Sequence, residues 1–464
     1  MRWFLRGALA GSCLVGSAVY GGEWKVVPAI GLTERYSDNI ALSPPPDAEG
    51  EFVTTISPNL LVDGVGRRVR ADLNYRMEAI YYSSKKNSAV FHHLNSNIGA
   101  EITKDWFYVD AQATRSQQPV VSTDVGVLDN FSLTNDRTNV TTSMLSPYLR
   151  HEFGEGMSAE VRYSQSMINY SALQVSDSRV NKISAFIGDN QSVGDLGWAL
   201  DYSQQQHDFD MGADSEFRRA ELNLWYFLNS RLRLLLDTGR EKIIFDSLLT
   251  SEEAVTEKSF WLAGLSWRPN ARMLMEGQYG ERFFGKSSTL RVKSGLRNAN
   301  IGINYTEDIT SVAVLDPEQE VDGRSSLMNS EVSSLNTEAF VRKKLTFNLD
   351  WSVERNTFYV TTFASKRNFQ LTKSKEEDRG AVVKWTRNMA RGSVATVEVG
   401  KKEMEIQLTG QKDELLTAEA NVSIRLGRRL SSIYSYRRTE RESIAFIKGY
   451  NVNVLGVSFK LTFP

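Results

Sequence analysis

Histidine and carboxylate side chains are the residues of this sequence best suited to act as acids, bases or metal ligands. One segment brings them together: Asp208 and Asp210 follow His207 at the predicted outer end of a strand. A hydrolase would need a positioned nucleophile or activated water within hydrogen-bond reach of that base. No second cluster completes such a site, so a hydrolase is the least favoured alternative, and we predict that the chain is not an enzyme.

The remaining candidate ligands also favour structural roles. His92 and His93 are adjacent, so a strand would point them to opposite faces, and they would not share a metal ion. His151 precedes a predicted turn with no ligand nearby. Asp38-Asn39 is more typical of a turn in which a side chain bonds the backbone than of a cation site. We therefore predict no metal and no cofactor.

The N-terminal segment predicts export from the cytoplasm. Arg2 and Arg6 are followed by an uncharged run from 7 to 20, which is typical of a secretory signal peptide. We assign 1–22 to this signal and 23–464 to one domain. Cys13, the only cysteine, lies in the signal, so the mature chain would contain no disulfide. An alternative interpretation, a lipoprotein acylation site at Cys13, is disfavoured by the short apolar stretch before it.

The charge balance excludes one class of partner. The chain has 55 basic and 56 acidic residues, with no basic tract and no nucleic-acid-binding motif. Binding to a polynucleotide depends on neutralising its phosphates, so we predict no nucleic-acid partner.

Strict alternation of apolar and polar residues recurs along the mature chain. Between 69 and 81 the apolar side chains fall on one face, and the other face carries Arg70, Asp72, Asn74, Arg76 and Glu78. Segments 345–354 and 417–426 alternate in the same way. Successive side chains of a strand point to opposite faces, so each segment would have one apolar and one hydrated side.

The lengths of these segments favour a membrane barrel over a soluble sandwich. They run for about 10 to 15 residues, whereas soluble strands average about 5 to 6 and membrane strands need about 9 to 11. We predict an all-β, transmembrane antiparallel barrel of about 22 strands (range about 18 to 22), because an even number is typical of outer-membrane barrels. Its outward aromatic residues would mark the bilayer boundaries: Phe107, Tyr163, Trp198, Trp267, Trp351 and Trp385.

The connections should alternate between tight turns and long loops. We expect tight turns at 64–68, 103–105, 153–156, 193–195, 229–231, 268–272, 295–298, 343–344, 388–392 and 427–429. We expect long loops within 117–137, 246–257, 311–331 and 364–377. An even strand count would leave both termini in the periplasm. The last strand alternates Val457, Phe459, Leu461 and Phe463 with polar residues, as the barrel-assembly machinery requires.

A barrel of this size encloses a lumen that is either plugged or filled with water. Charged residues in the hydrated registers are the predicted lumen-lining residues: Arg70, Asp72, Arg76, Glu160, Arg162, Asp201, Arg219, Glu221, Asp237, Asp350, Glu354, Glu398, Glu419 and Arg425. Both signs are present, so we expect ion pairs between strands and weak charge selectivity. The outer surface would contact outer-membrane lipid.

Several strand and turn motifs resemble those of the PEP-CTERM system-associated outer-membrane proteins. They include residues 28–39, 55–58, 92–95, 110–111, 116–118 and 305–308. The resemblance implies an outer-membrane barrel associated with exosortase and exopolysaccharide systems of Gram-negative bacteria. It carries over no catalytic or binding residue.

Two functional hypotheses follow. The first is a channel or assembly component for exporting an exopolysaccharide, working with its export proteins. The second is a closed barrel whose external loops bind polysaccharide or surface proteins.

Overall fold

The computed structural model describes residues 22–463 except 86–87, 120–129, 135–136, 155, 173–174, 190–194, 246–253, 311–337 and 445–448. The predicted signal peptide therefore lies almost entirely outside the described residues. Among the described residues, no helix is long and apolar enough to span a bilayer.

The described residues form an antiparallel sheet of 22 strands. Their bounds are β1 Glu23–Ser37, β2 Glu51–Val65, β3 Val69–Tyr82, β4 Ser88–Thr103, β5 Phe107–Pro119, β6 Arg137–Phe153, β7 Met157–Tyr170, β8 Ser178–Asp189, β9 Leu196–Phe209, β10 Ser215–Asn229, β11 Leu232–Phe245, β12 Ala254–Asn270, β13 Met273–Arg282, β14 Gly285–Gly295, β15 Ala299–Thr310, β16 Phe340–Val353, β17 Asn356–Phe369, β18 Lys375–Asn388, β19 Val394–Ile406, β20 Gln411–Arg425, β21 Leu430–Ile444 and β22 Tyr450–Thr462.

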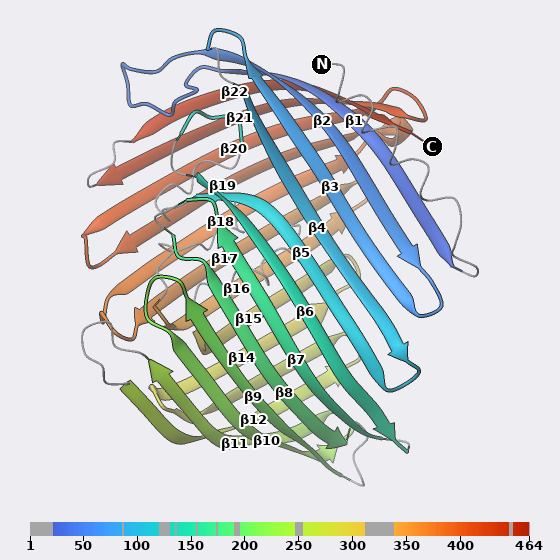
Figure 1. Ribbon diagram of the computed structural model, residues 1–464, viewed down its shortest axis with the longest axis vertical. Helices are drawn as coiled ribbons and strands as arrows, with labels where there is room; N and C mark the ends of the chain where they lie inside the picture. Colours follow the sequence, from blue (N-terminus) through green and yellow to red (C-terminus); the bar gives the residue numbers. More distant parts are fainter. Residues whose placement is uncertain are drawn as a thin grey trace.

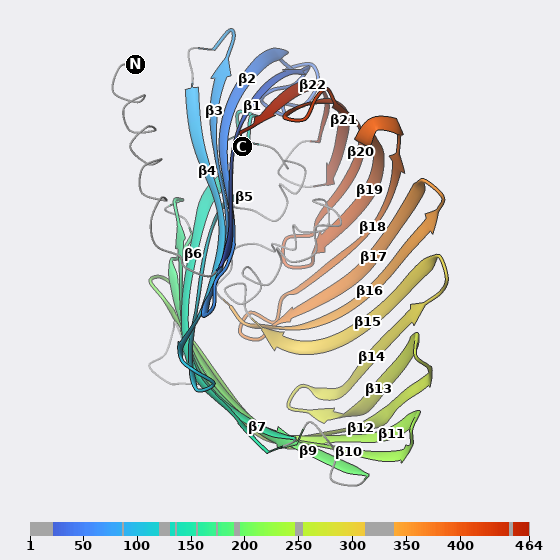
Figure 2. The same ribbon diagram turned by 90° about the vertical axis from the view of Figure 1, so that its right-hand side faces the viewer.

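The sheet closes on itself into a barrel. Every strand pairs with its neighbours in the sequence, and β1 also pairs with β22 from Ala29↔Thr462 to Ser37↔Val454 (Figures 1 and 2). Closure removes the unpaired strand edges that a bilayer would leave without hydrogen-bond partners. The predicted fold class and strand number are confirmed.

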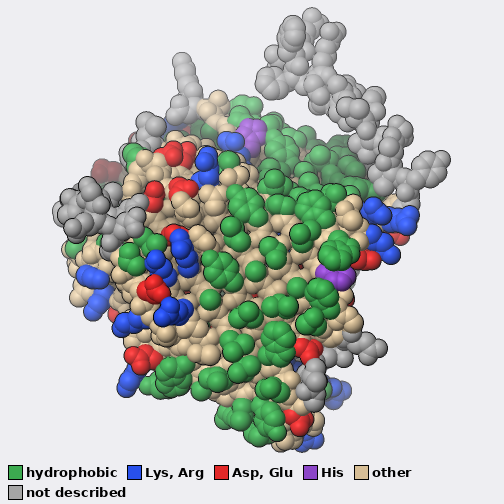
Figure 3. Space-filling view, turned by 60° about the horizontal axis from the view of Figure 1, so that its bottom comes forward, with side chains coloured by type: hydrophobic (Ala, Val, Ile, Leu, Met, Phe, Trp, Pro, Cys, Tyr) green, Lys and Arg blue, Asp and Glu red, His purple; other side chains and the backbone are tan. Residues whose placement is uncertain are grey.

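One face of every strand carries the apolar residues. Leu149 and Val161 are paired across β6 and β7 and are 53% and 54% exposed. Leu32 and Phe459 have the same relation across the closing junction. Figure 3 shows hydrophobic side chains over a broad area of the outer surface, with charged side chains toward its edges. We call this the outer face and the opposite, polar face the inner face.

Aromatic residues on the outer face gather near strand ends. Trp351 of β16 stacks on Phe358 of β17 at 5.4 Å between ring centroids, and Phe358 pairs in register with Trp385 of β18. Aromatic rings with this placement are typical of the bilayer boundary. The pairings put all six predicted boundary aromatics on the outer face.

The tight turns lie at one end of the barrel, here called the turn end, where β1 begins and β22 finishes. The opposite end is the loop end. Nine of the ten predicted turns fall between strands at the turn end, although 190–194 lies outside the described residues. The predicted loop 311–331 also lies outside them, as do most of 246–257 and parts of 117–137.

One predicted turn is wrong, and one predicted loop is too long. Lys343 and Lys344 lie inside β16, and most of 364–377 belongs to β17 and β18, whose actual connection is 370–374. Adjacent lysines suggested a turn, but neighbouring residues of a strand point to opposite faces. Lys343 Nζ meets Glu307 Oε2 of β15 at 3.0 Å. At the start of β18, alternate charged side chains have partners on each face: Glu376 and Asp378 meet Arg367 on the inner face, and Glu377 meets Lys366 on the outer face.

Glycines allow close approach of strands at defined points. A Cβ at Gly280 would lie 1.8 Å from the Trp261 backbone oxygen, whereas a Cβ at Gly302 would meet nothing nearer than 3.9 Å. We expect Gly280→Ala to lower the free energy of unfolding by about 1–3 kcal/mol, the usual cost of overpacking. The matched Gly302→Ala should leave it unchanged or higher. Urea unfolding in lipid vesicles, followed by tryptophan fluorescence, measures both, and equal effects would contradict this explanation.

Candidate functional site on the inner face

The strand registers put thirteen of the fourteen predicted lumen-lining residues on the inner face. These are Arg70, Asp72 and Arg76 of β3, Glu160 and Arg162 of β7, Asp201 of β9, Arg219 and Glu221 of β10, Asp237 of β11, Asp350 of β16, Glu398 of β19, and Glu419 and Arg425 of β20. Glu354 is the exception. It lies in the turn between β16 and β17 with φ of 53°, so strand alternation does not assign its side chain to a face.

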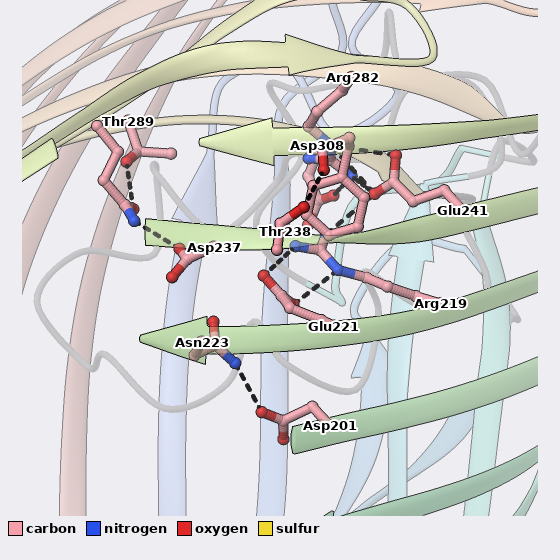
Figure 4. A network of polar contacts seen from close by, with 12 residues as sticks. Asp201, Arg219, Glu221, Asn223, Asp237, Thr238, Glu241, Arg282, Thr289 and Asp308 are labelled. Atoms are coloured by element: carbon pink, nitrogen blue, oxygen red, sulfur yellow. Dashed lines mark hydrogen bonds and ion pairs between the residues drawn. The ribbon is translucent and has the colours of Figure 1, made fainter. Parts of the chain in front are cut away.

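One group of polar contacts joins β10, β11, β13 and β15. Arg219 meets Glu221 at 2.8 Å and Glu241 of β11 at 3.1 Å. Glu241 also pairs with Arg282 of β13, whose side chain is 5% exposed. Figure 4 shows the two guanidinium groups on either side of the Glu241 carboxylate. The three strands are thus joined by side-chain ion pairs as well as by their backbones.

Arg282 reaches beyond its neighbouring strand. Its Nη1 donates to the Glu307 backbone oxygen at 2.8 Å, and its Nη2 meets Asp308 Oδ1 at 3.2 Å, both on β15. Its guanidinium also lies 5.0 Å from the centroid of the Phe284 ring. All three guanidinium nitrogens thus have acceptors in a buried site, where a charged group needs partners to offset its desolvation.

A second row of contacts lies beside this group. Asn223 donates to Asp201 at 2.8 Å, and Gln278 donates to Asp237. Thr289 Oγ1 in turn donates to Gln278 Oε1 at 3.3 Å (Figure 4). The row consists of two separate links, one between β9 and β10 and one from β11 through β13 to β14. Its carboxylate, amide and hydroxyl groups are suited to hydrogen-bonding a polar ligand.

Other inner-face charges are paired elsewhere around the barrel. Arg162 meets Asp110 and Glu160, each at 2.8 Å, and lies 3.6 Å from the centroid of the Tyr148 ring. On the opposite part of the sheet, Arg437 Nε meets Glu419 Oε2 at 2.8 Å. The expected ion pairs between strands are present.

A buried cluster occupies the inner face toward the loop end of β17 and β18. Arg367 is 1% exposed and meets Glu376 at 3.3 Å and Asp378 at 3.5 Å. Phe340 lies 5.9 Å from the same guanidinium. We call Arg367, Glu376 and Asp378 the buried triad. An ion group this deeply buried is held together by its mutual attraction and is costly to break.

Sequence reasoning missed the residues that complete these groups. Glu241 shares the strand parity of Asp237, and Arg282 shares that of Gln278, so register alone would have identified both. The buried triad was missed because 364–377 was assigned to a loop. Asp308 is the last residue of the motif at 305–308 and was not assigned a side-chain role.

The histidines do not form a reactive site. His207 is buried on the inner face, with the Phe217 ring centroid 5.2 Å away, whereas Asp208 is on the outer face. His92 contacts Tyr75 on the outer face, and His93 contacts Glu78 on the inner face, so their predicted opposite orientation is confirmed. Among the described residues, no group of three or more His, Cys, Asp or Glu side chains has the geometry to hold a metal.

Two connections at the loop end fold over the inner face. Ile40, from the β1–β2 connection, and Phe131, from the β5–β6 connection, are buried against Val53, Ile80 and Tyr450. The Leu133 amide donates to the Ile40 backbone oxygen at 2.8 Å. Apolar packing therefore narrows this end of the barrel beside β1, β2 and β22.

Similar solved structures identify the architecture. The chain aligns with the FrpB iron transporter from Neisseria meningitidis at 8% identity and a TM-score of 0.54, covering 94% of this chain and 81% of that one. It aligns with the ferric enterobactin receptor of Pseudomonas aeruginosa at 10% identity and a TM-score of 0.51, covering 96% of this chain and 82% of that one. The siderophore receptor PirA from Acinetobacter baumannii aligns at 8% identity and a TM-score of 0.50, covering 96% of this chain and 81% of that one.

The chain is an outer-membrane β-barrel. Its likeness to these barrels extends around the whole wall, and at this identity it concerns the fold alone. No family model and no curated protein matches the sequence. The comparisons therefore lend no support to the family resemblance drawn from the sequence motifs.

Proposed function

We propose that this barrel is a passage through the outer membrane for a secreted product, with the charged inner face lining a water-filled lumen. The observation that carries the proposal is closure of 22 strands around an inner face with charges of both signs. A barrel of about twenty strands encloses far more space than its own side chains fill. Paired charges along such a lumen keep it hydrated without holding ions of one sign.

Exopolysaccharide is the product class that we propose, because of the sequence motifs at 28–39 and 305–308. Hydroxyl-rich polymers are held by amide, carboxylate and hydroxyl groups such as the row from Asp201 to Thr289. In this proposal both termini face the periplasm, and export proteins are the partners there. The barrel-assembly machinery would recognise β22, and residues 1–22 would be removed.

Conductance in planar bilayers tests the passage. We expect the purified barrel to give stepwise currents with weak ion selectivity, because the inner-face charges are paired with opposite ones. Replacing Ile40 with aspartate should raise the conductance, since a charge cannot remain in the apolar cluster with Val53 and Ile80. The control is Asp47→Asn in the exposed part of the same connection.

The second candidate function is a closed barrel whose loops bind polysaccharide or surface proteins. The burial of Ile40 and Phe131 over the inner face favours it. It predicts that the unmodified barrel never conducts, whereas Ile40→Asp does. If neither protein conducts while both remain folded and heat-modifiable on gels, the passage proposal is wrong.

A further inference from the structure

In the described wall, pairing stops well short of the loop end at two junctions, β4–β5, which ends at Leu94↔Arg115, and β14–β15. Pairing between β14 and β15 covers six residues of each strand and ends at Leu290↔Tyr305. In contrast, β13 and β14 remain paired to Arg282↔Gly285, and β15 and β16 to Thr310↔Phe340. Within the described chain, residues 285–289 and 306–310 are therefore joined to a neighbouring strand on one side only. Figure 2 shows β14 diverging from β15 away from the turn that connects them. We call this stretch the seam.

Side chains replace the missing backbone ladder across the seam. Arg282 reaches over it to the Glu307 backbone oxygen and the Asp308 carboxylate. On the outer face, Ser288 Oγ of β14 donates across the seam to the Glu307 carboxylate of β15 at 3.5 Å. Tyr305, on the same strand as Glu307, donates to that carboxylate as well. A few side-chain bonds can separate without unfolding the strands on either side, because those strands keep their other partners.

The seam begins at the edge of the apolar part of the outer face. On β14 the outward residue Leu290 is 42% exposed, and the next outward positions are Ser288 and Lys286. On β13 the corresponding change is from Tyr279 to Glu281. The seam therefore lies at the level of the lipid head groups, and its end at Leu290 touches the hydrocarbon.

A groove of about 700 Å³ leads to the Leu290 end of the seam. Its apolar lining comes from the outer face and includes Leu265, Gly277 and Leu290. Its lining also includes Gln278 and Thr289, which belong to the inner-face row of polar contacts. The groove thus follows the apolar outer face as far as Thr289, the first residue of β14 without a β15 partner, whose side chain is on the inner face.

We propose that the seam is a lateral opening through which an amphiphile with an acyl chain passes between the barrel interior and the adjoining leaflet. The acyl chain lies in the groove between Leu265 and Leu290, and the polar head hydrogen-bonds with Gln278 and Thr289. Arg282 and Glu307 close the opening when it is unoccupied. This inference does not depend on whether the lumen conducts ions.

Lipid quenching of a single cysteine label tests the opening. Thr289→Cys and Thr361→Cys both carry a bimane on the inner face, but Thr361 is paired with a strand on each side. In vesicles containing phosphatidylcholine with a nitroxide on its acyl chain, we expect several-fold stronger quenching at position 289 than at 361. Leu265→Cys on the outer face gives the level for full lipid contact.

Two further measurements keep the result decisive. Ser288→Ala removes one bond across the seam and should increase quenching at 289 without affecting 361. Amide hydrogen exchange at 286–289 and 306–310 should exceed that of the equivalent residues in β16 and β17. Equal quenching at 289 and 361, unchanged by Ser288→Ala, would show that lipid does not enter and would overturn the proposal even if the barrel conducts.

Discussion

Replacing Arg367 with methionine should lower the free energy of unfolding by about 3–5 kcal/mol, because it leaves two buried carboxylates without their common cation. Glu376 and Asp378 are 3% and 2% exposed. Urea unfolding in lipid vesicles, with the folded fraction read from heat-modifiability on gels, measures the change. This is the largest effect that we expect from any single substitution in the described chain.

The control for this substitution is its neighbour in the sequence. Lys366 pairs with Glu377 at 2.8 Å on the outer side of the same strands, and both side chains are more than half exposed. Lys366→Met should therefore change stability by no more than about 1 kcal/mol. Neutralising the whole buried triad, with Glu376→Gln and Asp378→Asn added to Arg367→Met, should recover most of the loss. No recovery would show that the packing around Arg367 matters more than its charge.

Arginine at position 349 should destabilise the barrel by about 2–4 kcal/mol, whereas arginine at position 348 should be tolerated. Leu349 lies on the outer face between Ile301 and Val360, so Leu349→Arg puts a charge into hydrocarbon. Asn348 lies on the inner face beside a cavity of about 600 Å³, which has room for the longer side chain.

Unfolding and refolding in vesicles compares the two variants directly. The residues are adjacent and receive the same side chain, so strand propensity and total charge are matched. The difference between them therefore reports which face meets lipid. If Asn348→Arg proved the more harmful, our assignment of the two faces of β16 would be reversed.

Much of the fold could be predicted from the sequence because alternation is a local property. Asp350 and Trp351 illustrate this: polar and aromatic neighbours on one strand identify both faces and the level of the bilayer boundary. The failures occur where local chemistry has two interpretations. Lys343-Lys344 fits a turn as well as a strand, and only the partner Glu307 on β15 decides between them.

It was harder to predict from the sequence which side chains contact one another than which face each of them occupies. Arg219 and Glu221 are two residues apart, so their pairing follows from one strand. The contact of Arg282 with Asp308 depends on where β14 ends and β15 begins, which no local pattern reports. The incomplete ladder between those strands is likewise a property of their relative register.

The closing junction sets the order of folding. Thr33 and Ser458 share a hydrogen bond across 425 positions, whereas hairpin contacts such as Arg35 with Thr55 span 20. Loop-closure entropy rises as about (3/2)RT ln n, so this last contact costs about 3 kcal/mol more than a hairpin contact. Assembly therefore proceeds from hairpin to hairpin and finishes with one slow step that joins the distant ends of the chain. Until that step, β1 and β22 expose free edges that a second copy could capture.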